Sequence, residues 1–293
     1  MMTQEHEGTL LPPEAVPSEF LGTARTVRIY LPPSYSSAPR RRYPVLYLHD
    51  GQNVFSSAGP DCCFGWGNWA IDKTVNRLVR EQRMSEVIVV GVDNSRSRYR
   101  EYRGRLAGEP PGTTPFDNYA RFLVKELKLM VDRRFRTLKV PARTAVMGSS
   151  LGGICSVSLA WEYPRTFGLA ASLSGSFQLE RQNFIQRVLR PYKGRRHPFR
   201  LYLDSGVIDY TGDDDDRRHT DAVAVELRRL GWKNGSSLCH YTDLHPMNDV
   251  ELAHAGLRPD KWHEARTSQH NELYWRVRAW RALTFLFPPG PAR

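Results

Sequence analysis

The sequence predicts an α/β fold with a mostly parallel central sheet that is covered by helices on both faces. Short apolar runs alternate with longer amphipathic stretches along nearly the whole chain of 293 residues, which is the order of strand and helix expected for such a sheet. Runs such as Tyr43–Leu48 and Glu86–Val92 are apolar without alternation, as expected of strands buried on both faces. A glycine-flanked serine at a strand-to-helix junction, Ser150, also favours this class.

Seven strands are expected in order. The first, Thr23–Tyr30, alternates small or apolar residues with polar ones, which indicates a place near the edge of the sheet. Residues 1–20 before it are interpreted as an N-terminal extension. The remaining predicted strands are Tyr43–Leu48, Glu86–Val92, Thr144–Met147, Gly168–Leu173, Arg200–Leu203 and Ser237–Tyr241.

Helical patterns lie between these strands. The clearest is Asn118–Phe135, whose residues Phe122, Leu123, Leu127 and Val131 fall on one face. Residues 243–267 are the least regular stretch and are interpreted as an insertion that forms a lid or rim. No linker or repeat divides the chain, so residues 21–288 are predicted to form one domain. The other predicted helices are Trp69–Val79, Leu151–Trp161, Thr220–Leu230 and Asn271–Leu286.

Charge and composition exclude several classes of function. The net charge of +11 is carried mainly by arginines in scattered groups, and no basic stripe with a nucleic-acid-reading motif is present. Solvated arginine faces are the favoured interpretation, and attraction of an anionic substrate is the alternative. No apolar run is long enough to span a bilayer. The polar segment Met1–Gly8 does not resemble a secretory signal, so we expect a cytoplasmic protein, with a mature secreted form as the alternative.

The cysteines are expected to be reduced and structural. The chain has four of them, Cys62, Cys63, Cys155 and Cys239, and no C-x-x-C pair. Adjacent cysteines rarely bond to each other, because disulfide geometry strains neighbouring residues. Zinc-finger spacing is absent. We therefore predict no metal and no organic cofactor.

The motif that carries most information is Gly148-x-Ser150-x-Gly152. It follows an apolar run and precedes a helix-capable stretch, which is the context of a nucleophile elbow. Small flanking residues are needed because side chains there would collide with the strand and the helix. The serine hydroxyl would be exposed beside a helix N-terminus. The alternative is a glycine-rich turn with an incidental serine.

A serine nucleophile needs a histidine base, and that histidine needs an acid to orient it. In this type of sheet the acid follows the serine and the histidine comes last. Asp209 follows the strand Arg200–Leu203 and a glycine turn, and it is the predicted acid. The run Asp213–Asp216 is interpreted as a solvated loop and helix cap, and Asp204 as structural. His270 immediately precedes the last predicted helix and is the predicted base, with His245 and His254 as the alternatives.

Two backbone N–H groups are expected to bind the oxyanion. One belongs to Leu151, directly after the serine, and the other to Gln52, in the loop after an early strand, with Gly51 or Asn53 as alternatives. Ordinary core packing is the alternative for the aromatic candidates, and pairing with Glu101 is the alternative for Arg98. The candidates for lining the substrate pocket are Asn53, Phe55, Trp66, Trp69, Arg98 and Tyr102.

Taken together, several segments resemble the esterase D or enterochelin-esterase-like family of α/β-hydrolases. They follow the family order from about residue 20 across nearly the whole chain. The matching segments are Tyr30–Tyr35, Tyr43–Asn53, Gly91–Asn94 with Arg98 and Glu101–Tyr102, Met147–Gly153, Tyr202–Gly206 with Asp209, and His270–Glu272 with Trp275. The resemblance implies an α/β-hydrolase fold, a triad of Ser150, Asp209 and His270, and an oxyanion site near Leu151 and Gln52. The gap from Asp209 to His270 is longer than is usual in the family, because it contains residues 243–267.

The resemblance implies ester chemistry without specifying the ester, because the family includes siderophore trilactone esterases, feruloyl and acetyl esterases, S-formylglutathione hydrolases and mycolyltransferases. We therefore expect a serine carboxylic-ester hydrolase that forms an acyl-enzyme on a small-molecule ester, with no specific nucleic-acid or membrane partner. The alternatives are an acyltransferase or thioesterase on the same triad, or a non-catalytic basic binding protein on a hydrolase scaffold. No oligomeric state is predicted.

Overall fold

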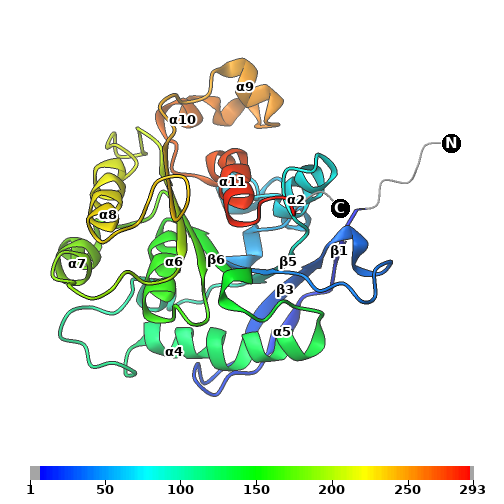
Figure 1. Cartoon of the computed structure of the whole chain (residues 1–293). Helices are drawn as coiled ribbons and strands as arrows, with labels where there is room; N and C mark the ends of the chain where they lie inside the picture. Colours follow the sequence, from blue (N-terminus) through cyan, green and yellow to red (C-terminus); the bar gives the residue numbers. More distant parts are fainter. Residues whose placement is uncertain (1–6, 291–293) are drawn as a thin grey trace.

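A twisted, mostly parallel sheet forms the centre of the molecule, as the computed structural model of the chain shows for residues 7–290 (Figure 1). Its order is β1-β3-β5-β4-β6-β7-β8-β9, and β2 also pairs with β3. The neighbours from β5 through β4 to β9 are all parallel, whereas β3 runs antiparallel to β5. The strands are β1 Thr9–Leu10, β2 Glu14–Val16, β3 Arg25–Leu31, β4 Val45–His49, β5 Ile88–Val92, β6 Thr144–Ser149, β7 Leu169–Leu173, β8 Arg200–Ser205 and β9 Leu238–Thr242.

Every predicted strand is present, and the predicted fold class is confirmed. The continuous apolar runs of β4 and β5 are buried at all five positions of each strand, because helices cover both faces of the sheet. The expected N-terminal extension differs from the structure. Residues 9–16 of it add β1 and β2 to the sheet by pairing antiparallel with β3, whereas residues 1–6 lie outside the described part.

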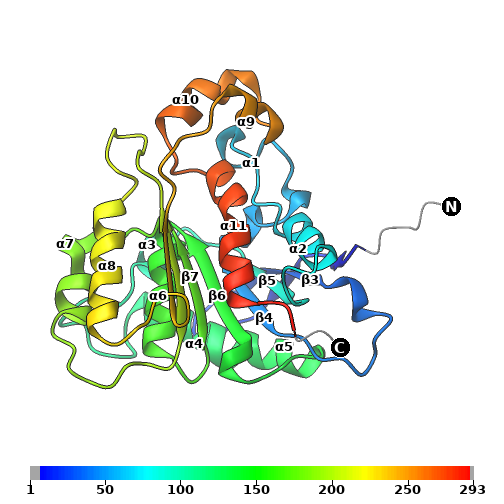
Figure 2. The ribbon, with the colours of Figure 1, turned by 45° about the horizontal axis from the view of Figure 1, so that its top comes forward.

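Two helical layers enclose the sheet (Figure 2). On one face, α4, α5, α6 and α8 pack into one apolar cluster. On the other face, α2 and α11 pack into a second cluster and contact each other. The helices are α1 Cys62–Gly65, α2 Ile71–Arg80, α3 Arg98–Tyr102, α4 Pro115–Arg121, α5 Lys128–Arg134, α6 Leu151–Glu162, α7 Leu179–Asn183, α8 Arg217–Arg229, α9 Asp249–His254, α10 Trp262–Thr267 and α11 Glu272–Leu286.

The predicted helix over residues 118–135 is α4 and α5 joined by a π-helical stretch, Phe122–Leu127. Its start is set by a capping box, in which Thr114 accepts from the backbone N–H of Asp117 and the Asp117 carboxylate accepts from the backbone of Thr114. The predicted apolar face is buried, including Phe122, Leu127 and Val131. No helix within residues 7–290 is both long enough and apolar enough to cross a membrane.

The irregular stretch at residues 243–267 forms two short helices, α9 and α10, beyond the end of the sheet (Figure 1). Leu252, Leu257 and Ala265 pack there into a small cluster with Leu273 and Tyr274 of α11. This cluster attaches the two helices to the start of α11, and not to the main core. The Trp66 ring lies 5.2 Å from the ammonium group of Lys261, just before α10, so this segment reaches the loop between β4 and α2.

A buried ion pair holds β3 against α3. The guanidinium of Arg25 donates two hydrogen bonds to Glu101, at 2.8 and 3.0 Å, and both side chains are almost fully buried. Glu101 therefore pairs with Arg25 on β3, and not with Arg98 as the sequence alternative had it. Arg98 instead pairs with Asp50.

We predict that Glu101→Leu lowers the free energy of unfolding by about 3–5 kcal/mol, because it leaves the Arg25 charge buried without a partner. The double variant Arg25→Met with Glu101→Leu should regain most of that loss, since it removes both charges. Urea unfolding followed by circular dichroism measures both values. If Glu101→Leu were as stable as the wild type, the Arg25 charge would not depend on Glu101 for compensation.

Candidate active site

Ser150 occupies a sharp turn between β6 and α6. Its backbone has φ 54° and ψ −123°, in a region that L-residues rarely adopt. A Cβ on Gly148 would lie 2.7 Å from the Gly152 backbone, and one on Gly152 would lie 3.1 Å from the Cβ of His49. A side chain at position 148 is therefore excluded by the backbone, and one at position 152 would be tight against His49, in line with the motif. The Ser150 side chain is only half-buried, and the Ser150 N–H donates to the carbonyl of Leu173 on β7.

His270 reaches Ser150 from a loop 120 positions later in the chain. Its Nε2 lies 3.0 Å from the Ser150 Oγ. The loop ends at Asn271, whose side chain caps α11 by accepting from the Tyr274 N–H. The edge of the His270 ring packs against Trp275 of α11, with the ring centroids 5.1 Å apart. The structure thus brings together the predicted serine and histidine.

The carboxylate beside His270 belongs to Asp215, and not to Asp209 as predicted. Asp215 Oδ1 lies 2.6 Å from His270 Nδ1, and its side chain is fully buried. Its Oδ2 accepts hydrogen bonds from the Ser174 hydroxyl at 2.6 Å and from the Gly206 N–H at 2.5 Å. The interpretation of residues 213–216 as a solvated loop is therefore wrong for Asp215.

Asp209 is turned toward its own loop. Its carboxylate accepts from the backbone N–H and hydroxyl of Thr211 and from the N–H of Asp213. The chain leaves β8, closes this loop, and returns to the sheet only just before α8, where Asp215 and Asp216 have φ values of 51° and 57°. The detour displaces the buried carboxylate six positions along the chain. Four aspartates in a row gave no periodic signal by which Asp215 could be distinguished.

The charged form of Asp215 is favoured despite its burial. Burial by itself would raise its pKa, but the hydrogen bond from His270 and the positive charges of His270 and Arg278 outweigh this effect. The pKa of Asp215 therefore lies below its usual value. The side chain is an ionised acceptor at neutral pH, which is the state needed to orient an imidazole.

The predicted oxyanion residues flank Ser150. Leu151 is the first residue of α6, and Gln52 lies in a tight turn, Gly51–Asn53, that follows β4. This turn lies close to the end of β5. The absence of a side chain at Gly51 permits the approach, because a Cβ there would lie 2.5 Å from the backbone of Gly91. The Gln52 side chain accepts from the Asn94 N–H at 3.1 Å, and Gln52 lines the same cavity as Ser150.

A cavity of about 490 Å³ opens beside Ser150 and His270. Of the predicted pocket residues, Asn53 and Arg98 line it. Phe55, Trp69 and Tyr102 do not; they are 1%, 3% and 0% exposed and belong to the core, which was their stated alternative. Trp66, the remaining aromatic candidate, also lines the cavity. Other lining residues were not expected, because nothing in their spacing separates them from core positions: Cys63, Phe64, Tyr210, Glu272 and Trp275.

The charges that line the cavity are largely compensated. Arg98 donates two hydrogen bonds to Asp50, at 2.6 and 2.8 Å, and the Asn94 side chain donates a third to the same carboxylate. Glu272 accepts from the Asn53 side chain at 3.2 Å, and burial raises the pKa of Glu272. Although the chain has a positive net charge, the guanidinium that lines this cavity, that of Arg98, is paired with a carboxylate.

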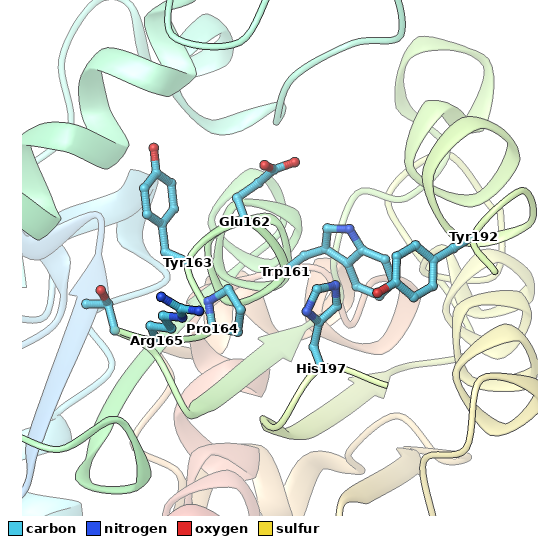
Figure 3. Close-up of a pocket in the computed structure, with 8 residues that line it drawn as sticks. Trp161, Glu162, Tyr163, Pro164, Arg165, Tyr192 and His197 are labelled. Atoms are coloured by element: carbon cyan, nitrogen blue, oxygen red, sulfur yellow. The ribbon is translucent and has the colours of Figure 1, made fainter. Parts of the chain in front are cut away.

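Another hollow, of about 530 Å³, lies at the opposite end of α6 (Figure 3). Its side chains include Trp161, Tyr192 and His197, whose rings pack on one another, with centroids 4.6 Å apart for Trp161 and His197 and 5.3 Å apart for Tyr192 and His197. Ser150 begins α6 and Trp161 lies near its other end, so this hollow is separated from the serine and histidine by the length of the helix. Neither Ser150 nor His270 lines this hollow.

Comparison with known proteins gives a family and several structural relatives. A family model described as "Putative esterase" matches residues 18–245. Two uncharacterized Bacillus subtilis proteins, YjcH and YbbA, are 27% and 25% identical over 52% and 56% of this chain. These alignments cover 55% and 61% of the two relatives, so the chain spans a little over half of the curated proteins that it matches.

Similar solved structures have low sequence identity. A ferulic acid esterase aligns with a TM-score of 0.68 and 15% identity over 96% of this chain and 98% of that one. The enterobactin esterase of Shigella flexneri aligns with a TM-score of 0.65 and 17% identity over 96% and 59%. An IroE-like serine hydrolase from Shewanella oneidensis aligns with a TM-score of 0.61 and 17% identity over 93% and 79%. These likenesses show the shared fold.

We predict that proton NMR of the imidazole N–H groups will identify the carboxylate that contacts His270. A short hydrogen bond to an ionised carboxylate shifts the Nδ1 proton far downfield. Asp215→Asn should abolish this resonance, whereas the matched variant Asp209→Asn should leave it in place. The opposite pattern would show that Asp209 is the partner in solution.

Proposed function

The chain belongs to the Esterase family, and we propose that it is a carboxylic-ester hydrolase that forms an acyl-enzyme on Ser150. The observation that carries this proposal is the chain of contacts from Ser150 Oγ through His270 to Asp215, at 3.0 and 2.6 Å. A serine within hydrogen-bond reach of a histidine, itself held by a buried carboxylate, is the arrangement that activates a hydroxyl nucleophile. The strained turn presents that hydroxyl at the cavity.

In the first half-reaction the Ser150 oxygen attacks the ester carbonyl while His270 takes the hydroxyl proton. Collapse of the tetrahedral intermediate breaks the bond to the alcohol, and His270 returns the proton to the departing oxygen. In the second half-reaction water attacks the acyl-enzyme while His270 takes one of its protons. Collapse of the second tetrahedral intermediate breaks the bond between the acyl carbon and Ser150 Oγ, His270 returns the proton to that oxygen, and the carboxylic acid leaves. The Asp215 carboxylate accepts a hydrogen bond from the Nδ1–H of His270 throughout, and it stabilises the imidazolium that forms twice in each cycle.

Two backbone N–H groups are proposed to stabilise the negative oxygen of each tetrahedral intermediate. The Leu151 N–H lies at the start of α6, where the helix dipole adds positive potential. The Gln52 N–H is supplied from the turn after β4, on the same cavity. Each such donor is typically worth about 2.7–4 kcal/mol of transition-state stabilisation.

The proposed substrate is a small ester with an apolar or aromatic part. Phe64 and Tyr210 line the cavity and are 93% and 76% exposed, so their rings are available at its mouth, near Trp66. The solved structures that share the fold include enzymes named for ferulic acid and enterobactin esters, which is consistent with this choice. Pairing of Arg98 with Asp50 argues against the anionic substrate that the net charge suggested.

We predict that Ser150→Ala abolishes hydrolysis of p-nitrophenyl acetate and labelling by a fluorophosphonate probe, because it removes the oxygen that becomes acylated. Ser176→Ala is the matched control, since the Ser176 hydroxyl lies 3.3 Å from that of Ser150. It should keep labelling. Near-wild-type turnover in Ser150→Ala would exclude the proposal.

Asp215→Asn should lower kcat by a factor on the order of 10³–10⁴, because the amide favours the wrong tautomer of His270. Asp209→Asn should lower kcat less than threefold, since its carboxylate bonds within its own loop. Steady-state kinetics with the same ester compares the two variants. Equal losses, or a greater loss in Asp209→Asn, would refute the assignment of Asp215 as the acid.

A further inference from the structure

A buried arginine lies behind the carboxylate that holds His270. Arg278, on α11, is 1% exposed, and α11 packs against β7 and β8 (Figure 2). Its Nη2 donates to the Ser174 hydroxyl at 2.7 Å. Its guanidinium also forms ion pairs with three carboxylates: Asp204 at 3.4 Å, Asp215 at 3.8 Å and Asp243 at 3.9 Å.

Ser174 links this guanidinium to Asp215. It follows β7 with a φ of 45°, and its hydroxyl donates to Asp215 Oδ2 at 2.6 Å. The Ser174 hydroxyl oxygen in turn accepts a hydrogen bond from Arg278 at 2.7 Å and one from the Trp275 indole N–H at 3.1 Å. Trp275 and Arg278 are three positions apart on α11 and so lie on one helix face. That face therefore fixes the Ser174 hydroxyl in the one orientation that donates to Asp215.

Arg278 also supplies positive charge where two carboxylates are fully buried. Asp204 and Asp215 have no solvent exposure, and a buried carboxylate stays ionised only when it is paired and hydrogen-bonded. Burial raises the pKa of Asp204 to about 6, even though Arg278 and the Tyr202 hydroxyl favour its charged form. Without Arg278, the two carboxylates would lose the cation that they share, and Asp215 would keep only its contacts with His270, Ser174 and Gly206 among those described above.

Resting on the function proposed above, we propose that Arg278 is a positioning residue for the reaction. Its hydrogen bond to Ser174 orients Asp215. Its positive charge keeps Asp215 ionised. The same charge offsets part of the negative charge of the buried carboxylates, which by itself would stabilise the protonated form of His270. Arg278 therefore helps to set the balance of charge around the imidazole of His270. It acts on the site through its hydrogen bond to Ser174 and through its charge beside Asp204 and Asp215.

Loss of the guanidinium makes the surroundings of His270 more negative and stabilises its protonated, inactive form. The acidic limb of the pH profile of kcat/KM should then move to higher pH. Asp204→Asn removes a negative charge from the same cluster, so it should move the limb to lower pH.

Other titratable groups lie near this cluster and are unchanged in these variants. Tyr202 belongs to β8, Asp243 follows β9, Tyr274 lies near Arg278 from α11, and Glu272 of α11 lies near His270. On the side of α8, Asp216 pairs with His219, and burial raises the pKa of Asp216 to about 6. The test therefore compares shifts between variants rather than the absolute position of the limb.

The experiment measures kcat and KM from pH 5 to pH 9 for the wild type, Arg278→Met, Arg278→Lys and Ser174→Ala. Arg278→Met should shift the acidic limb to higher pH and lower kcat at least tenfold with little change in KM. Arg278→Lys should restore the position of the limb, because it keeps the charge. Ser174→Ala should lower kcat without a shift, because it removes the bridge and keeps the charge.

Arg281→Met is the matched control on the same helix. Arg281 donates to the Tyr241 hydroxyl at 2.9 Å and forms no ion pair with the cluster, so its loss should leave both limb and kcat unchanged. An unshifted limb in folded Arg278→Met, or an equal shift in Arg281→Met, would overturn the proposal.

Thermal unfolding establishes which variants are folded. If Arg278→Met does not fold, Asp204→Asn decides the question: a limb at lower pH supports the charge effect, and an unchanged limb overturns it. Ser150→Ala separates the two levels of the argument. Activity that survives in Ser150→Ala refutes the proposed function itself, whereas loss of activity there with no limb shift in the other variants refutes only the role of Arg278.

Discussion

The turn at Ser150 is the constraint on which the site depends. A serine with φ 54° lies between a buried strand and a buried helix, where Gly148 leaves no Cβ against the Gly152 backbone and Gly152 leaves none against the His49 side chain. The strain is tolerated because β6 lies at the centre of the sheet, paired with β4 and β7, and α6 packs over it. The rigid surroundings determine where the hydroxyl is, and every other group of the site has to reach that point.

The groups that reach it come from the carboxyl ends of the parallel strands, where loops of unrelated length converge. The loop after β4 brings Gln52 and Asn53, the loop after β8 brings Asp215, and the segment before α11 brings His270. Helix α11 contributes more than its capping residue. Its inner face supplies Trp275 and Arg278, so the helix that orients His270 also supports the carboxylate behind it.

The distribution of charge separates the surface from the site. The chain carries a net charge of +11, yet the guanidinium groups near the site are engaged: Arg98 by Asp50, and Arg278 by three carboxylates. Arginine enrichment is therefore a property of the solvated surface and of structural ion pairs such as Arg25 with Glu101. The apolar side chains at the cavity mouth, Phe64 and Tyr210, carry more information about the proposed substrate than net charge does.

Local pattern was sufficient for the order of strands and helices, for the turn at Ser150, and for the place of His270 before the last helix. These features follow from neighbours in sequence: buried runs, small residues around a serine, and a loop residue ahead of an amphipathic segment. Tertiary structure alone decided which carboxylate meets His270, since the loop after β8 closes on Asp209 before Asp215 returns to the sheet. It also decided that Phe55, Trp69 and Tyr102 are core residues while Phe64, Trp66 and Tyr210 line the cavity. An aromatic ring packs equally well in either place, and only the path of the chain determines whether it faces the core or the opening.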